Sequence, residues 1–305
     1  MLGLATDPQV LSIQSHVVWG YVGNKSAVFP LQLLGFEVHA INSVQFSNHT
    51  GYGKWTGGVL NSGELADLMS GLESNRLDSF THILTGYVGS ESFLQQVYET
   101  VKHLKEKNPN TIYVCDPVMG DNGEMYVPKE LLNIYRDKLI PLADISIYNF
   151  QSFRLLTGKT ILSEVDAVES MQILHSMGAK TVVVSSSVLG SNGDLVAFGS
   201  TDKDGVKEAW KIDIPRLPHL FTGTGDLFTA LLLAWMYRCN GNLPQAMEYS
   251  IGTLQAVLQR TLCHSKDVAA STTSSDSSRV LELRLIQSKL DIENPPQTFQ
   301  ATRLN

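Results

Sequence analysis

Short apolar runs alternate with segments of helical character along most of the chain, and this alternation limits the fold more than any other feature. Runs of strand length occupy residues 10–13, 36–44, 81–84, 111–115, 145–147 and 181–184, whereas residues 25–34, 65–72 and 93–107 have the pattern of helices. Strands separated by helices need crossover connections, which produce a parallel sheet covered on both faces. The pattern predicts an α/β fold with a central, mostly parallel sheet flanked by helices.

The last third of the chain has a different character. Residues 195–198 and 209–214 are predicted to form an antiparallel pair around a polar loop at 200–205, and two long helices are predicted at 226–237 and 243–262. A Ser/Thr-rich stretch at 269–278 is expected to be a mobile surface loop before a last helix at 280–290. Neither a repeat nor a long linker divides the sequence, so we expect one domain over residues 1–305.

Composition excludes several classes of function. Of the 305 residues, 43% are hydrophobic and 17% charged, enough for a large core. Lys and Arg number 23 against 30 Asp and Glu, a net charge of −7, which argues against a nucleic-acid partner. The longest apolar run, 227–236, is too short to cross a bilayer, and no basic segment follows Met1 as in a signal peptide. Three widely spaced cysteines form neither a disulfide framework nor a zinc motif. We expect a soluble, cytoplasmic protein without a membrane partner.

Polar residues gather where the predicted strands end. Ser15 and His16 follow the first strand, residues 85–87 the third, Asp116 the fourth, and residues 185–187 the strand at 181–184. In open parallel sheets, ligands bind beyond the carboxyl ends of the strands. The sequence therefore predicts a ligand site at this edge of the sheet.

The sharpest local feature is a glycine-rich turn, Thr222-Gly223-Thr224-Gly225-Asp226, directly before an apolar helix. Glycines allow close backbone approach, and the free N–H groups of a helix start attract phosphate. Asp226 could accept a proton from a substrate hydroxyl while these amides stabilise a transferring phosphoryl group. The alternative is that Thr224 or Asp226 only caps a buried helix. No Gly-Lys-Ser/Thr follows, so the turn is not a Walker A loop.

Residues 223–226 resemble the anion-hole motif of ribokinase-like kinases. Three further segments narrow the resemblance: residues 10–52, with LSIQSHV, GYVGN and NSVQFSNHTGY; LTGY at 84–87; and CDPVMGD at 115–121. Together they resemble pyridoxal kinase of the animal type over nearly the full chain. The resemblance implies a ribokinase-like three-layer sandwich, a homodimer, and ATP-dependent phosphorylation of the 5′-hydroxyl of pyridoxal, pyridoxine and pyridoxamine. The product would be pyridoxal 5′-phosphate, in vitamin B6 salvage.

The resemblance also implies a role for each matching position. Asp226 matches the catalytic base, and Gly223, Thr224 and Gly225 match the anion hole for the γ-phosphate. The remaining matches are Ser15, Val44, Thr50 and Tyr87 (with Asp226) for the vitamin; Asp116, Asn149, Ser185, Ser186 and Thr224 for ATP; and Asp116 and Asp121 for Mg²⁺ or another divalent cation. Ser185 falls where the family usually has a Thr near the monovalent cation, K⁺ or Na⁺. His49 is a further candidate for the vitamin site, and residues 121–126 for a short flap over ATP.

One segment departs from the family pattern. Where the family reads Thr-Pro-Asn, followed after two residues by Glu, this chain has Ile147, Tyr148, Asn149 and then Ser152. Isoleucine offers no side-chain oxygen, and serine is a neutral substitute for a carboxylate near magnesium. The chain is therefore an active kinase, a weakened kinase or a non-catalytic protein that binds B6 vitamers, unless the difference is a sequence anomaly. A kinase for another hydroxymethyl heterocycle, such as hydroxymethylpyrimidine, is a further alternative.

Overall fold

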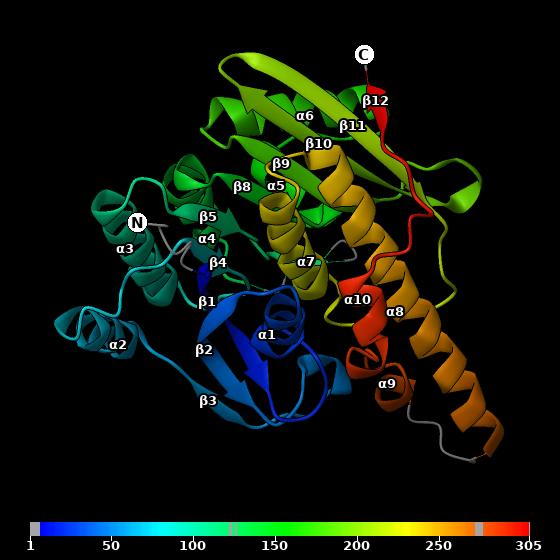
Figure 1. The fold of residues 1–305 in the computed structure, drawn as a ribbon, viewed down its shortest axis with the longest axis horizontal. Coiled ribbons are helices and arrows are strands. Elements are labelled where there is room, and N and C mark those ends of the chain that lie inside the picture. The colour runs from blue at the N-terminus through cyan, green and yellow to red at the C-terminus, as the bar shows by residue number, and fades with distance from the viewer. Residues whose placement is uncertain (1–6, 122–123, 126, 272–276, 305) are drawn as a thin grey trace, which may run out of the picture.

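The computed structural model describes residues 7–121, 124–125, 127–271 and 277–304. In the described residues the main sheet has ten strands in the order β12-β11-β10-β9-β8-β5-β4-β1-β2-β3 (Figure 1). Its strands are β1 (Gln9–Val17), β2 (Glu37–Phe46), β3 (Gly57–Val59), β4 (His82–Thr85), β5 (Ile112–Cys115), β8 (Ile145–Tyr148), β9 (Thr181–Ser187), β10 (Leu195–Lys203), β11 (Val206–Ile214) and β12 (Thr302–Leu304). A separate hairpin pairs β6 (Gly120–Asp121) with β7 (Glu124–Met125).

The centre of the main sheet is parallel, as the alternation predicts. The pairs β2–β1, β1–β4, β4–β5, β5–β8 and β8–β9 are all parallel, whereas β3 at one edge and β10, β11 and β12 at the other run antiparallel to their neighbours. The carboxyl ends of the parallel strands thus share one edge of the sheet, where the polar residues were expected to meet.

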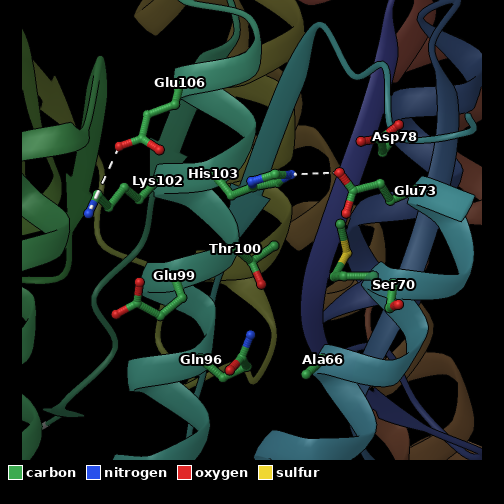
Figure 2. Close-up of a pocket in the computed structure, with 11 residues that line it drawn as sticks. Ala66, Ser70, Glu73, Asp78, Gln96, Glu99, Thr100, Lys102, His103 and Glu106 are labelled. Atoms are coloured by element: carbon green, nitrogen blue, oxygen red, sulfur yellow. Dashed lines mark ion pairs between the residues drawn. The ribbon is translucent and has the colours of Figure 1, made fainter.

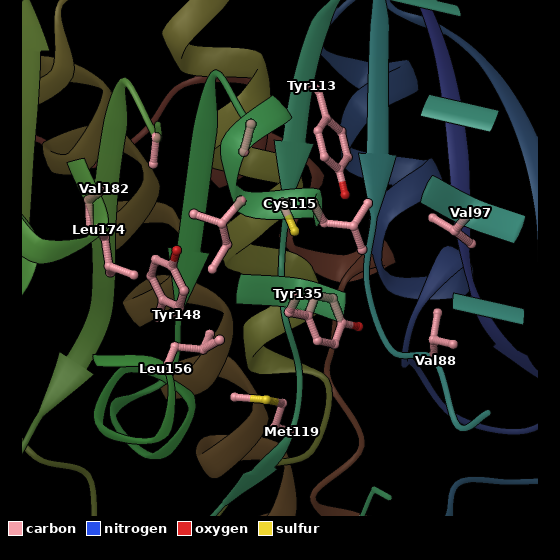
Figure 3. Packing of buried hydrophobic residues seen from close by; sticks show 14 of the residues in the cluster. Val88, Val97, Tyr113, Cys115, Met119, Tyr135, Tyr148, Leu156, Leu174 and Val182 are labelled. Atoms are coloured by element: carbon pink, nitrogen blue, oxygen red, sulfur yellow. The ribbon is translucent and has the colours of Figure 1, made fainter. Parts of the chain in front are cut away.

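Helices cover both faces of the sheet and give three layers (Figure 1). One face is packed by α1 (Asn24–Leu33), α7 (Thr224–Arg238), α8 (Leu243–Ser271) and α10 (Lys289–Glu293). The other is packed by α2 (Ser62–Ser74), α3 (Glu91–Lys107), α4 (Glu130–Ile134), α5 (Phe150–Thr157) and α6 (Glu164–Ser176), around a core that includes Tyr113, Tyr135 and Tyr148 (Figure 3). Shorter elements are α9 (Ser277–Val280), η1 (Thr50–Tyr52), η2 (Tyr135–Leu139), η3 (Ile140–Leu142), η4 (Ser191–Gly193) and η5 (Ile286–Ser288). Among the described helices, none is both long and apolar enough to cross a membrane.

Three boundaries differ from the sequence prediction. Strands β10 and β11 continue to Lys203 and from Val206, so most of the predicted polar loop is paired strand and the turn is Asp204-Gly205. Helix α8 runs on to Ser271, so the start of the predicted Ser/Thr-rich loop is helical, while residues 272–276 lie outside the described residues. The predicted helix at 280–290 is wrong, because α9, η5 and α10 divide this segment.

Candidate active site

The first turn of α7 is built around two glycines with different surroundings. Gly223, at the N-cap, has φ +83°, and a Cβ there would lie 1.9 Å from the carbonyl oxygen of Tyr21. The Ser26 hydroxyl donates to the Gly223 carbonyl at 3.2 Å. A Cβ on Gly225, by contrast, would meet nothing within 4 Å. The turn is thus packed against Tyr21 and Ser26 at Gly223 and has open space at Gly225, as an anion site on helix N–H groups requires.

Asp226 is linked through one glycine to the end of β1. The backbone N–H of Gly23 donates to the Asp226 carboxylate, and burial nevertheless raises the pKa of this carboxyl to about 6. Gly23 has φ +53°, and a Cβ there would lie 2.0 Å from the carbonyl oxygen and 2.4 Å from the hydroxyl oxygen of Ser15. Only glycine fits between these groups. Gly23 therefore contacts Ser15 on one side and Asp226 on the other, so it alone separates Ser15 from the predicted catalytic base.

A second carboxylate faces Asp226 from the sheet. Asp116 follows β5, is buried, and accepts a hydrogen bond from the Thr229 hydroxyl at 3.1 Å. Burial, together with the negative charge of Asp226, raises its pKa to about 8. The negative charge of Asp226 thus opposes ionisation of Asp116, and a divalent cation would relieve that repulsion. The donor chemistry therefore fits a magnesium site. Asp121 is placed only by its backbone, on β6.

Four predicted vitamin-site residues lie on neighbouring elements. Ser15 is on β1, Val44 on β2, Tyr87 two residues after β4 and Thr50 on η1, and β1 lies between β2 and β4 in the sheet. The Ser43 hydroxyl donates to the Tyr87 carbonyl at 3.3 Å. Burial raises the pKa of the Tyr87 phenol, so it remains a neutral donor.

The loop that carries Thr50 meets the glycine-rich turn. A Cβ on Gly51 would lie 3.7 Å from the Thr222 hydroxyl oxygen. The segments around Ser15, Thr50 and Asp226 are thus linked by close contacts. One position differs: β1 extends to Val17, so Ser15 and His16 lie within the strand, next to a register shift, and not after it.

The predicted nucleotide-side residues cluster around the ends of β8 and β9. Asn149 caps α5, since its Oδ1 accepts the Ser152 N–H at 2.8 Å, and its Nδ2 donates to the Gly120 carbonyl at 2.8 Å. The Ser185 hydroxyl donates to the Tyr148 carbonyl at 3.3 Å. Because β9 continues to Ser187, Ser185 and Ser186 are also strand residues, contrary to the prediction that they follow it.

Both unusual residues of the departing segment are buried. Ile147 is 2% exposed and packs in the core on the α7–α8 face of the sheet. Ser152 is 1% exposed, and its hydroxyl accepts the Met119 N–H at 3.1 Å. The serine thus satisfies a buried backbone donor three residues after Asp116 in the sequence, while neither residue brings a negative charge.

A hollow of about 390 Å³ lies between α2 and α3, beside the amino ends of β4 and β5 (Figure 2). Among the described residues, Glu73, Asp78 and His103 form a group there whose ligand atoms lie within 4.8 Å of one another. His103 pairs with Glu73 at 3.4 Å and Asp78 pairs with Lys107 at 2.5 Å. These ion pairs account for the cluster, which lies at the sheet edge opposite to Asp226.

Sequence reasoning missed three contacts of the site: the Gly23 N–H on Asp226, the Thr229 hydroxyl on Asp116, and the side chain of Glu282. The glycine had a signal, because it stands in a glycine-punctuated turn after the first strand. Thr229 looks like an ordinary helix residue, and Glu282 lies more than fifty residues beyond Asp226, so no local pattern points to either.

Solved structures with the same architecture are known. Pyridoxal kinase from Leishmania donovani in complex with ADP and pyridoxamine has a TM-score of 0.89 at 33% identity, over 98% of this chain and 100% of that one. The structure from Plasmodium falciparum with AMP-PNP and PL has a TM-score of 0.85 at 26% identity, over 98% and 99%. The fold, and a glycine turn that carries Asp226 near the second carboxylate Asp116, define a kinase of the ribokinase-like class.

Sequence relatives specify the family within that class. A family model described as phosphomethylpyrimidine kinase matches residues 72–270. The pyridoxal kinase of Arabidopsis thaliana is 52% identical, over 99% of this chain and 97% of that protein, and the pyridoxal kinase of Homo sapiens is 49% identical, over 97% and 98%. The chain belongs to the pyridoxal kinase family.

Proposed function

We propose that this chain, acting as one kinase domain, transfers the γ-phosphoryl group of ATP to the 5′-hydroxyl of pyridoxal, and also of pyridoxine and pyridoxamine. The product with pyridoxal is pyridoxal 5′-phosphate, so the reaction belongs to vitamin B6 salvage. The observation that carries the proposal is the line Ser15–Gly23–Asp226 at the open N-terminus of α7, with Asp116 opposite. Phosphoryl transfer depends on positioning and charge neutralisation, and this arrangement supplies both.

The division of roles follows the sheet edge. Ser15, Thr50 and Tyr87 supply hydrogen-bonding groups for the pyridine ring, and Val44, buried on β2, supplies an apolar contact. Asp226 accepts the proton of the 5′-hydroxyl as its oxygen attacks phosphorus. Its pKa of about 6 leaves it ionised at neutral pH, with more basicity than an exposed carboxylate.

The amides of residues 223–225 stabilise the charge on the transferring phosphoryl oxygens. On the nucleotide side, Asp116, Asn149, Ser185, Ser186 and Thr224 contact ATP. Asp116 and Asp121 would hold Mg²⁺, which would neutralise phosphate charge. K⁺ or Na⁺ would lie near Ser185. Because Ile147 and Ser152 supply no charge, we propose that the kinase is active but holds magnesium more weakly than its relatives.

We also propose that the protein is a cytoplasmic homodimer. Four apolar side chains are exposed in segments at and near the β3 edge: Val18 (63%) and Trp19 (53%), directly after β1; Trp55 (45%), before β3; and Val59 (60%), on β3. The N–H groups of Val18 and Trp19 pair with β2 and the residue after it, and β2 pairs with β3. An exposed apolar cluster beside an unpaired strand edge favours association with a second copy.

The test is formation of pyridoxal 5′-phosphate by the purified protein with ATP, Mg²⁺ and K⁺. We expect product with the wild type, a rate lower by about 10²–10⁴-fold in Asp226→Ala, as for loss of a general base, and no change in Asp213→Ala, an exposed strand carboxylate. Pyridoxal binding without product would favour the non-catalytic alternative. A faster rate with hydroxymethylpyrimidine than with pyridoxal would favour the alternative of a kinase for another hydroxymethyl heterocycle.

A further inference from the structure

Glu282 joins three segments that are far apart in the sequence. Its side chain is 13% exposed and lies in the irregular segment between α9 and η5. One carboxylate oxygen, Oε1, lies 3.2 Å from Nε2 of His49 and accepts the Tyr52 hydroxyl at 2.8 Å. The other oxygen, Oε2, accepts the Tyr21 N–H at 3.0 Å. A single carboxylate thus fastens the loop after β1 and the loop after β2 to the C-terminal segment.

Both loops lead directly to the proposed chemistry. Thr50 stands between His49 and Tyr52, the two residues bound to Oε1. In the loop after β1, the N–H of Tyr21 donates to Glu282, and the carbonyl oxygen of the same residue lies against Gly223 at the start of α7. Two residues later, Gly23 donates to Asp226. The position of the carboxylate therefore affects the vitamin contact and the base at once.

The backbone is shaped around this side chain. Gly20 has φ +90°, and a Cβ there would lie 2.3 Å and 2.5 Å from the two Glu282 oxygens. The carboxylate is ionised: although burial opposes it, the hydrogen bonds from His49 and Tyr52 lower the pKa of Glu282. Bonds from donors to a charged acceptor are the stronger kind, so these fix loop geometry better than neutral ones would.

We propose that Glu282 is a positioning residue for the vitamin site, which holds the loops carrying Thr50 and Gly23 in register with Asp226. It does not touch the reacting atoms; it acts through Tyr21, His49 and Tyr52. The inference rests on the proposed function, because it assigns the vitamin to these loops. It extends that function by making the C-terminal segment part of the vitamin site, although this segment lies far from the site in sequence.

The experiment compares Glu282→Gln with Asp291→Asn. Gln keeps the size of the side chain and removes its charge. Asp291 ties the same C-terminal segment to α8 through its ion pair with Arg260 at 2.8 Å, and not to either loop, so it controls for loosening of the segment. Kd for pyridoxal and for a non-hydrolysable ATP analogue are measured by calorimetry, beside kcat, KM and Tm. Tyr52→Phe, which removes one donor from Glu282, is a second variant in case Glu282→Gln folds poorly.

We expect Glu282→Gln to weaken pyridoxal binding about tenfold and Tyr52→Phe by less, with the ATP-analogue Kd and the Asp291→Asn protein within about twofold of wild type. Equal losses in Glu282→Gln and Asp291→Asn would overturn the proposal, because docking of the segment alone would then explain them. So would equal losses for both ligands, or no loss. If the wild type forms no product, the proposed kinase activity fails separately, and the Kd values still decide the role of Glu282.

Discussion

Gly225 separates the two interpretations of the glycine-rich turn, anion site or simple helix cap. A Cβ at this position meets nothing within 4 Å, so Gly225→Ala leaves the unliganded fold undisturbed and slightly favours the helix. If phosphate lies against this turn, the methyl group blocks its approach. We expect Tm to stay within a few degrees while kcat/KM for ATP falls at least tenfold, which is about 1.4 kcal/mol of transition-state stabilisation.

The control for this change is Gly241→Ala. Gly241 also has open space around it, but φ is +76°, so alanine there is strained. We expect the control to lower Tm and to leave the kinetic constants of the folded enzyme unchanged. Kinetics and thermal unfolding of both variants check this. If Gly225→Ala has wild-type kinetics, the turn is only a helix cap.

At the scale of elements, we expect the junction of β8 with α5 to set how strongly the proposed kinase binds magnesium. The family pattern has Thr and Glu where this chain has Ile147 and Ser152, and both of these side chains are buried. We expect the double change Ile147→Thr, Ser152→Glu to lower the Mg²⁺ concentration for half-maximal rate several-fold, because it restores a carboxylate where the family pattern has Glu. The double variant should also lose stability, since a hydroxyl enters the core and Met119 N–H loses its acceptor.

Magnesium titrations of kcat/KM in wild type, both single variants and the double variant measure this effect. Ser152→Ala is the matched control, because it removes the Met119 acceptor without adding charge. An unchanged half-maximal concentration in the double variant would mean that Asp116 and water alone set the affinity for the cation.

At the level of single elements, the sequence pattern predicted the parallel strands but not where each of them ends. Apolar runs mark β4 and β5 well, because both are buried on two faces. The pattern stops early in β1 and β9, because Ser15 and Ser185 are polar residues at register shifts, beyond which both strands continue. Periodicity measures burial and not backbone conformation, so polar residues at a bulge inside a strand look like the start of a loop.

The candidate site was predictable from the sequence only where its residues have a local signature. The glycine turn with Asp226 and the strand end with Asp116 have local signatures, and the structure brings them together. The network around Glu282 depends on contacts over 230 residues of sequence between Tyr52 and Glu282, and neither neighbourhood reveals it. Tertiary contacts of this kind follow from the fold and not from any local pattern.

For the whole molecule, His82 makes stability depend on pH. Burial lowers its pKa from 6.5 to about 4, in a cluster with Phe36 and Tyr237. Below pH 6.5 the unfolded chain binds a proton that the folded protein excludes, so the free energy of unfolding falls as pH falls, until about pH 4. At pH 5 the loss from this group is about 2 kcal/mol.

His82→Phe isolates this contribution, because it keeps an aromatic ring and removes the titration. Urea unfolding at pH 7.5 and pH 5 gives the free energies. We expect the difference between wild type and variant to shift by about 2 kcal/mol in favour of the variant at the lower pH. Parallel losses in both proteins would show that other groups cause the acid sensitivity.

The proposed homodimer can be tested at the apolar cluster of Val18, Trp19, Trp55 and Val59, because a second copy would bury these exposed side chains. Val59→Arg introduces a charge into the cluster, and burying an unpaired charge opposes association. Val206→Arg is the matched control: the same residue type, with 64% exposure against 60% for Val59, but on β11 near the opposite edge of the sheet.

Light scattering after gel filtration should give a dimer for wild type and Val206→Arg and a monomer for Val59→Arg. A monomeric wild type would contradict the homodimer. A dimer in all three proteins would mean that the interface lies elsewhere. If Val59→Arg is monomeric and keeps its kcat, each subunit carries a complete site, as expected when Ser15, Asp116, Asp226 and Glu282 all come from one chain.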